Sequence, residues 1–334
     1  MTTRPHDALV KFAFETPASA AALLRGLLPA AVRAAVAWKT LDRERGSFVD
    51  VLLGDHHSDL LFSARLRSGE PKLVYFLLEH QSTSDPTMPL RMISYMTRIW
   101  DRFIEDHPGA RLAPVIAVLV SHVPGGWRVA RAFEELFAPA VMALRGLAAL
   151  VPRFSMIVDD LAQLSDGDLA ARPLPAFPKL ALWLLRDARD SARLLDSFDA
   201  WIPSMLELER TRSGRNSFAV LLTYMFEVID PMHRDELRAK LQGLGSHTEE
   251  VAMTIAEQLR KEGRKEGLEK GIKKGLKKGR EEGRLAALRS LLVFKFRTIG
   301  PSYEAQLKTA TPEAIDLYLQ RVLVADSLAA VFED

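Results

Sequence analysis

The chain has 334 residues, of which 48% are hydrophobic and 26% are charged, a composition that fits a soluble globular protein with more than one domain. It contains no cysteine, which excludes disulfides, thiolate metal sites and cysteine nucleophiles and fits a reducing compartment. The formal net charge of +2 is too small to indicate a nucleic-acid partner by itself, and the sequence lacks both a signal-peptide core and an apolar run long enough to cross a membrane. We therefore expect a cytoplasmic protein.

Residues 6–37 have the pattern of three short helices. Asp7 can cap the first helix, and Pro17 stands where the second begins. Lys11 lies among the apolar positions of the first helix, where the simplest interpretation is a lysine whose charged end reaches solvent. His6 has an equally simple interpretation as a surface residue, and a role at a functional site is the alternative for both.

Residues 47–82 contain two short apolar runs separated by a turn. The runs extend from Asp59 to Leu66 and from Leu73 to Leu78, and glycine and proline lie between them, which is the pattern of a β-hairpin. The second run is apolar on both faces and predicts a central strand that is buried on both sides. We expect this strand to stop at the polar residues 79–81.

Acidic side chains stand at the margins of this predicted hairpin. Glu79 and Gln81 point to one side of their strand because side chains alternate, and Asp59 begins the paired run. A carboxylate that loses solvation there needs a partner, a proton or a cation, and a divalent cation relieves the repulsion between two carboxylates. Oxygen ligands with open water positions suit Mg²⁺ or Mn²⁺. The alternative is that these acids are solvated or salt-bridged, as acids at strand ends commonly are.

The pattern after the hairpin predicts a helix over residues 89–105 and short strands over residues 113–120 and 154–158. Three arginines lie off the apolar stripe of the helix: Arg91, Arg98 and Arg102. They form either a solvated face or a set of contacts to phosphate groups. The order of helix, strands, helix and strand indicates an α/β domain with a mixed central sheet.

Residues 167–255 are helical in pattern and carry no second constellation of acids or histidines. We therefore expect three parts: an α/β domain over residues 1–166, a helical support domain over residues 167–255, and a charged tail over residues 256–334.

Glycine recurs every four residues in the tail, from Gly263 to Gly283, among lysine, arginine and glutamate. Each glycine costs a helix about 1 kcal/mol relative to alanine, so this helix is weak by itself. A period of four keeps the glycines on one face, where a second helix can approach closely. The segment is a self-association helix, a basic arm for a nucleic-acid backbone, or a flexible linker. An amphipathic helix follows, whose leucines would add apolar area to an association: Leu285, Leu288, Leu291 and Leu292.

These segments together resemble the recombination-promoting nuclease family, whose members are also called YhgA-like transposases. The resemblance covers about residues 5–165 and 255–290, and it is carried by HDALVK at 6–11, SDLL at 58–61, EHQS at 79–82, RMISY at 91–95 and the glycine-spaced tail. Membership implies the PD-(D/E)XK nuclease superfamily, an αβββαβ core and Mg²⁺-dependent cleavage of DNA.

The resemblance also implies roles for single residues. Asp59 would be the invariant metal-binding aspartate and Glu79 the second metal ligand. Gln81 would stand where the superfamily more often has a lysine, as this family's E-x-Q variant does. His6 and Lys11 match the motif of the first helix.

Two positions depart from the family pattern. Val10 replaces a phenylalanine, which conserves packing, and residues 121–123 read Ser-His-Val instead of Tyr-His-Gly, which weakens a substrate-facing role for that loop. The sequence predicts a Mg²⁺-dependent DNA endonuclease of low sequence specificity that acts in recombination or on mobile elements and self-associates through its tail. The alternative is a catalytically silent DNA-binding or assembly protein with the same fold. A transposase that joins DNA ends has little support, because only two candidate acids stand on one hairpin.

Overall fold

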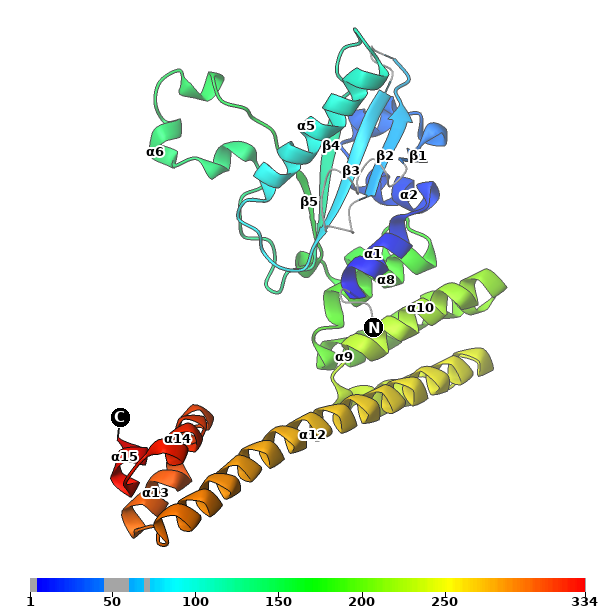
Figure 1. Ribbon diagram of the computed structural model, residues 1–334. Helices are drawn as coiled ribbons and strands as arrows, with labels where there is room; N and C mark the ends of the chain where they lie inside the picture. Colours follow the sequence, from blue (N-terminus) through cyan, green and yellow to red (C-terminus); the bar gives the residue numbers. More distant parts are fainter. Residues whose placement is uncertain (1–4, 45–59, 69–72, 334) are drawn as a thin grey trace. The chain divides into compact units, whose positions relative to one another are not determined.

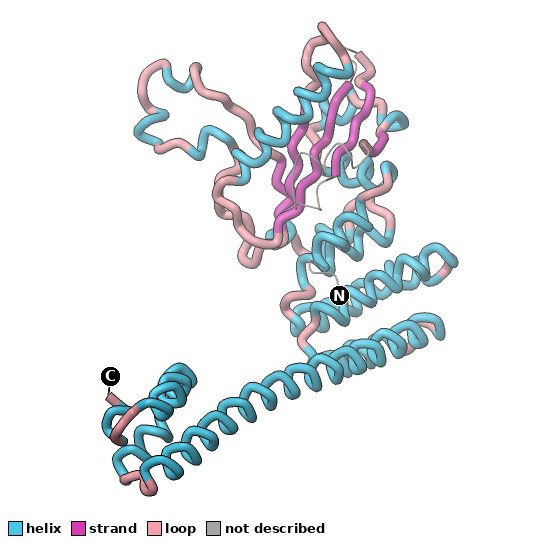
Figure 2. The backbone as a smooth tube through the Cα atoms, in the orientation of Figure 1, coloured by secondary structure: helices cyan, strands magenta, loops and turns pink. Residues whose placement is uncertain are grey.

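The computed structural model describes residues 5–44, 60–68 and 73–333. The chain divides into two compact units, residues 1–256 and 257–334, and we describe each by itself (Figure 1). All strands of the described residues lie in the first unit, whereas the described residues of the second form only helices and their connections (Figure 2).

Three helices begin the first unit, as the sequence predicts: α1 (Pro5–Phe14), α2 (Pro17–Leu27) and α3 (Ala30–Ala35). The side chain of Thr16 accepts a hydrogen bond from the backbone N–H of Ser19, so it caps α2, and Pro17 occupies the first turn, where a proline removes no helical hydrogen bond. Helix α1 buries Leu9 and Ala13 on its apolar face. A 3₁₀ turn, η1 (Trp38–Thr40), leads into the sheet.

Five strands form one mixed sheet in sequence order: β1 (Asp42–Arg43), β2 (Leu60–Arg65), β3 (Leu73–Gln81), β4 (Val115–Ser121) and β5 (Ile157–Asp160). The pairs β1–β2 and β2–β3 are antiparallel, whereas β3–β4 and β4–β5 are parallel. This confirms the predicted α/β class and the mixed sheet. The two residues of β1 are too few to form a pattern in the sequence.

The predicted hairpin is confirmed, with Leu60 opposite Leu78 and Arg65 opposite Leu73. The second strand, β3, ends at Gln81, among the polar residues 79–81 where the sequence predicts its end. Residues 79–81 pair in parallel with residues 119–121 of β4, so their backbone groups are bonded inside the sheet. Asp59 lies outside the described residues.

The two faces of β3 pack against different elements. Tyr75 and Leu77 lie in an apolar core with α5 (Met88–Asp106), the predicted helix after the hairpin. On the opposite face, Phe76 stacks on Trp38 and His80 contacts α1. Successive side chains therefore alternate between an α5 face and an α1 face.

The segment between β4 and β5 contains η3 (Phe133–Leu136), α6 (Pro139–Met142) and η4 (Leu147–Ala149). The chain after β5 is helical, as predicted, with η5 (Leu161–Gln163), α7 (Asp166–Ala170), α8 (Ala176–Asp187), α9 (Ser191–Glu209), α10 (Arg212–Val228), η6 (Pro231–His233) and α11 (Arg234–Leu241). Helices α8, α9 and α10 pack together, and α8 and α10 also pack on α1. This helical layer therefore belongs to the same compact unit as the sheet, and the predicted boundary at residues 166/167 stays a prediction.

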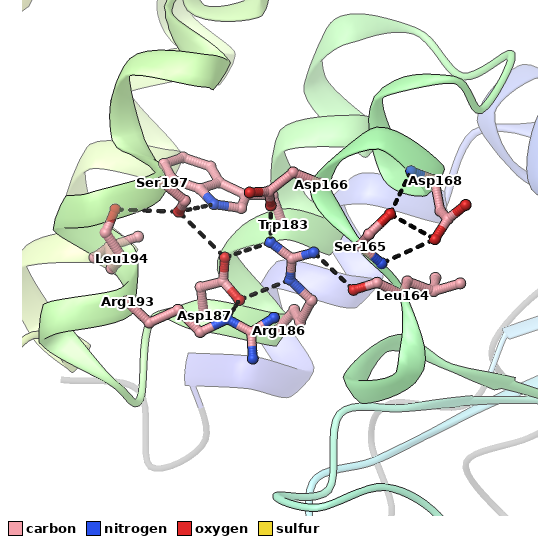
Figure 3. Close-up of polar contacts among 10 residues, drawn as sticks. All are labelled: Leu164, Ser165, Asp166, Asp168, Trp183, Arg186, Asp187, Arg193, Leu194 and Ser197. Carbon is pink, nitrogen blue, oxygen red and sulfur yellow. Dashed lines mark hydrogen bonds and ion pairs between the residues drawn. The ribbon is translucent and has the colours of Figure 1, made fainter.

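A charged cluster joins α8, α9 and the segment before α7 (Figure 3). The guanidinium of Arg186 donates to both carboxylate oxygens of Asp187, at 2.7 and 2.6 Å, and to the carbonyl of Leu164 at 2.9 Å. Arg186 also pairs with Asp166, and Arg193 of α9 lies 2.9 Å from Asp187. Since Arg186 and Asp187 are buried, they avoid the cost of isolated buried charges only by pairing.

The charged tail forms helix α12 (Ser246–Phe296), which continues without a break through the glycine repeat. In the second unit it is followed by α13 (Pro301–Thr309), α14 (Pro312–Val324) and α15 (Leu328–Phe332). The sequence interpretation missed these three helices, although Pro301 and Pro312 mark helix starts and Thr311 caps α14. Leu288 and Leu292 are fully buried in a core with residues of these helices. The prediction that they are available to a second chain is therefore wrong.

Candidate active site

The carboxyl ends of β3, β4 and β5 meet at one edge of the sheet. Gln81 is in register with Ser121, and Ser121 with Asp160. Since neighbouring residues in register share a face, these three side chains lie on the α5 face together with Glu79. Ligands of α/β proteins commonly bind outside the carboxyl ends of parallel strands, so this polar edge is a candidate site.

Glu79 is the buried acid of this edge, with a side chain that is only 1% exposed. Its Oε1 atom accepts hydrogen bonds from Gln81 Nε2 at 2.7 Å and from Arg91 Nη2 at 3.2 Å. Its Oε2 atom is buried and has no hydrogen-bond partner among the described residues. A buried carboxylate oxygen without a partner is costly, and a cation or a water would satisfy it.

Arg91 links Glu79 to the loop between β3 and α5. Its Nη1 donates to Asp85 Oδ2 at 2.9 Å, and its Nη2 donates to Tyr95 Oη at 3.1 Å. Burial acts to raise the pKa of Asp85, but hydrogen bonds from Arg91 and Thr87 outweigh it and hold that pKa below its usual value. The guanidinium predicted to meet DNA phosphates is thus held by two carboxylates of its own chain.

Three other predicted site residues, Arg98, Arg102 and Lys11, are exposed, whereas Glu79 is buried. Arg98 is exposed, and Arg102 is exposed and forms ion pairs within α5. Lys11 is exposed on α1, which contacts the opposite face of β3. Asp59 precedes Leu60, whose strand partner Leu78 comes directly before Glu79.

No group of three or more acidic or histidine side chains in the described part of the chain, which does not include Asp59, is arranged to hold a metal ion. The Oε2 atom of Glu79 nevertheless has the chemistry that a divalent cation requires. It is a carboxylate oxygen that is buried and has no partner among the described residues.

A cluster of histidines that the sequence interpretation missed lies on the α1 face. His80 Nδ1 is 3.1 Å from Asp7 Oδ1 of α1, and the His80 ring stacks on His122 with centroids 4.9 Å apart. His6 contacts His122 edge to face at 4.8 Å. These residues come from three of the segments that carry the family resemblance or depart from it. Their place in those segments was the available signal, but their contact depends on the fold.

Burial keeps His6 and His122 of this cluster uncharged. It lowers the pKa of His122 to about 2, with smaller effects from His80, His6 and Arg189, while a backbone hydrogen bond with Leu185 opposes the shift. Burial, followed by Arg189 and His80, lowers the pKa of His6 to about 4. Both rings are therefore neutral at pH 7 and pack as aromatic groups.

The cluster also connects the helical layer to the end of β3. Tyr224 Oη of α10 lies 2.7 Å from His6 Nδ1, and Arg189 contacts His6 Nε2 at 3.4 Å. Arg189 also donates to the carbonyl of Ser82 at 2.9 Å, directly after β3. Residues that follow Glu79 by more than 100 positions in the sequence therefore support the end of β3 on its α1 side.

None of the helices in the described part of the chain combines the length and the apolar character of a membrane span.

Comparison with known proteins identifies the family. The model of the family described as "Putative transposase, YhgA-like" matches residues 4–216. Over 264 residues the chain is 26% identical to recombination-promoting nuclease RpnA of Escherichia coli strain K12, covering 78% of this chain and 85% of RpnA. Over 264 residues it is 28% identical to recombination-promoting nuclease RpnD of E. coli O157:H7, covering 78% of this chain and 96% of RpnD.

A third relative carries a different description. Over 265 residues the chain is 26% identical to the inactive recombination-promoting nuclease-like protein RpnE of E. coli strain K12, covering 78% of this chain and 83% of RpnE. The relatives thus include proteins named as nucleases and a protein named as inactive. No solved structure gives a significant match. Since the family model spans well over half of its residues, the chain belongs to the YhgA-like transposase family.

Proposed function

We propose that this chain is a Mg²⁺-dependent DNA endonuclease of low sequence specificity that acts in recombination or on mobile elements. The observation that carries the proposal is Glu79 Oε2, a buried carboxylate oxygen without a described partner at the carboxyl edge of a mixed sheet. Asp59 would be the other metal ligand, and Mn²⁺ is the alternative to Mg²⁺ at such an oxygen site. The names of RpnA and RpnD support nuclease activity in relatives.

The order of elements supports a nuclease core of the PD-(D/E)XK type. Helices α1–α3, three antiparallel strands, helix α5 and the parallel strand β4 follow one another as an αβββαβ core requires. Asp59 directly precedes β2 in sequence, and the Glu79–Gln81 segment ends β3.

Glu79, Gln81 and Arg91 would each have a different role in phosphodiester cleavage. When bound, a divalent metal neutralises charge on the phosphate and activates a water. Glu79 would hold that metal through Oε2, and Gln81, which does not titrate, keeps Glu79 in place by donating to Oε1. Because Gln81 carries no charge, the cation that faces the phosphate must come from elsewhere. Arg91 already contacts Glu79 and is well placed to provide it.

Cleavage of both strands of a duplex calls for two copies of such a site. We place the contact between copies in the glycine repeat of α12, where Leu268, Ile272 and Leu276 are exposed at intervals of four residues. The glycines beside them leave room for a close approach.

A catalytically silent DNA-binding or assembly protein is the second candidate. Arg91 and Gln81 already neutralise and bond one oxygen of Glu79, which is also what a purely structural ion pair would show. The relative RpnE is named as inactive. This candidate predicts that the protein binds DNA but does not cleave it with any divalent metal ion.

Nicking of a supercoiled plasmid separates the two candidates. The wild-type protein is expected to nick in Mg²⁺ and Mn²⁺ but not in Ca²⁺ or EDTA. Asp59→Ala is expected to lose nicking while melting like the wild type, and Asp101→Ala, on the exposed side of α5, is expected to keep it. Equal cleavage by wild type and a folded Asp59→Ala would refute the proposal.

A further inference from the structure

Glu79 forms an ion pair with an arginine of its own chain. Arg91 Nη2 is 3.2 Å from Glu79 Oε1, and the side chain of Arg91 is 25% exposed. The same guanidinium lies 2.9 Å from Asp85 Oδ2 and 3.1 Å from Tyr95 Oη. The contact to Glu79 is the longest of these three. Arg91 could therefore release Glu79 while its contacts to Asp85 and Tyr95 hold it in the site.

A metal ion at Glu79 and the guanidinium of Arg91 compete for one negative charge. Like charges a few Å apart repel strongly where solvent is partly excluded, as it is around Glu79. The free Oε2 atom offers a metal a place to bind without first displacing Arg91. Binding there would still weaken the attraction between Glu79 and Arg91.

We propose, on the basis of the proposed nuclease function, that Arg91 is a switchable counter-ion. Without metal it neutralises Glu79, and with a divalent metal on Glu79 it turns to the scissile phosphate while Asp85 keeps it in the site. Arg91 is then the catalytic cation of this site, in place of the lysine that Gln81 does not supply.

The shape of arginine explains why this residue suits the task. Its planar guanidinium has five donors, so one edge stays on Asp85 while another is exchanged between a carboxylate and a phosphate. Lysine has a single ammonium group, so it cannot bind Asp85 and a second anion together in a fixed planar arrangement. The cation is also on a rigid helix, one turn before Tyr95, and not on a loop.

A purely structural ion pair gives different results. If Arg91 only fastens α5 to β3, then Arg91→Gln lowers the stability of the fold and leaves metal affinity unchanged. The two roles therefore differ in a binding measurement that needs neither DNA nor turnover.

The test measures Mn²⁺ binding to the full chain by electron paramagnetic resonance of free Mn²⁺, without DNA, beside plasmid nicking. Arg91→Gln is expected to bind Mn²⁺ about tenfold more tightly than wild type and to nick about 100-fold more slowly. Arg111→Gln, at an exposed arginine after the same helix, is expected to change neither value. Asp85→Asn leaves Arg91 with one fewer carboxylate and is expected to weaken Mn²⁺ binding; it serves as the second variant if Arg91→Gln does not fold.

The outcomes separate this proposal from the nuclease function. If Glu79→Gln abolishes Mn²⁺ binding but Arg91→Gln and Asp85→Asn both leave it unchanged, the counter-ion role is overturned and the metal site stands. If Glu79→Gln leaves Mn²⁺ binding unchanged, the metal site itself is wrong, and the role of Arg91 fails with it.

Discussion

His80 and His122 stack nearly face to face, with ring planes inclined by 15° and centroids 4.9 Å apart. His80 lies near the end of β3 and directly follows Glu79 in sequence, and His122 directly follows the adjacent parallel strand β4. The end of the strand thus presents a buried acid to its α5 face and a histidine stack to its α1 face. At residues 79–81, the proposed chemistry therefore depends on the α5 face of the strand, and stability depends on its α1 face.

The histidine stack predicts a loss of stability on acidification. The pKa of His122 falls from 6.5 to about 2 on folding, chiefly through burial. The unfolded chain therefore takes up the proton first, so the stabilisation is complete above pH 6.5 and is lost as the pH falls toward 2. Each pH unit below 6.5 costs up to about 1.4 kcal/mol for such a residue.

Urea denaturation at pH 7.5 and pH 5.0 measures this effect. The free energy of unfolding is expected to fall less between the two values in His122→Asn than in wild type, whereas His107→Asn, at an exposed position, should follow the wild type. An unchanged pH dependence in His122→Asn would show that the stack does not oppose protonation.

The buried charged cluster of the helical layer predicts a large cost for removing one charge. Asp187 is fully buried between Arg186 and Arg193 (Figure 3). Asp187→Asn leaves the buried guanidinium of Arg186 without its main partner and is expected to cost about 3–5 kcal/mol. Arg193→Gln removes a half-exposed partner and is expected to cost about 0–1 kcal/mol. Equal stability of the two variants in urea denaturation would contradict this assignment.

The parts of the fold that local sequence pattern decides were predictable, whereas the parts that depend on contacts distant in sequence were not. The apolar run of residues 73–78 predicts β3 because local pattern decides a buried strand. The end of β3 at the polar residues 79–81 was predicted as well, but the pairing of these residues with β4 was not, because it depends on the tertiary fold. The helices after Phe296 were missed, although their proline starts were visible, because the charge of the preceding repeat dominated the interpretation of the tail.

The site was predicted only in part, for the same reason. The same-side arrangement of Glu79 and Gln81 follows from strand alternation and is seen as a 2.7 Å hydrogen bond. The contact of Arg91 with Glu79 depends on how α5 crosses the sheet, which no local pattern encodes. His6 and Tyr224 lie 218 residues apart in sequence, so their contact is a property of the tertiary fold alone.

The exposed arginines of α5 predict a salt-dependent, sequence-independent contribution to DNA binding. Arg98 and Arg102 are exposed, whereas Arg91 is held by Glu79 and Asp85. Replacing both exposed arginines by glutamine should reduce the log–log slope of affinity against salt by about 0.9 for each phosphate that the variant no longer binds. Fluorescence anisotropy with two unrelated duplexes measures this slope, with Arg210→Gln as the control. Weaker binding to one duplex alone would indicate base recognition instead.

The glycine repeat predicts weak self-association of the tail. Leu268, Ile272 and Leu276 are exposed, and nothing described lies within 4 Å of where a Cβ atom would stand on the neighbouring glycines. Ion pairs along this helix, such as Lys278 with Glu282 at 3.6 Å, are exposed and contribute about 0–1 kcal/mol each. Apolar contact must therefore dominate. Replacing the three apolar residues by glutamine should lower the mass seen in sedimentation at high concentration, and Lys273→Gln should not.

If the wild type and the triple variant sediment with the same subunit number at every concentration, the repeat is a linker or a DNA arm. Association would then have to use another surface.

The central claim is that Glu79 holds the metal ion that cleaves DNA. The most direct measurement is the rate of supercoiled plasmid nicking in Mg²⁺ by Glu79→Gln, a variant of nearly equal shape, beside wild type and the exposed-site control Glu105→Gln. The account predicts a loss of at least about 100-fold for Glu79→Gln, with melting temperatures close to that of the wild type and no loss for Glu105→Gln. Wild-type nicking by folded Glu79→Gln would contradict it.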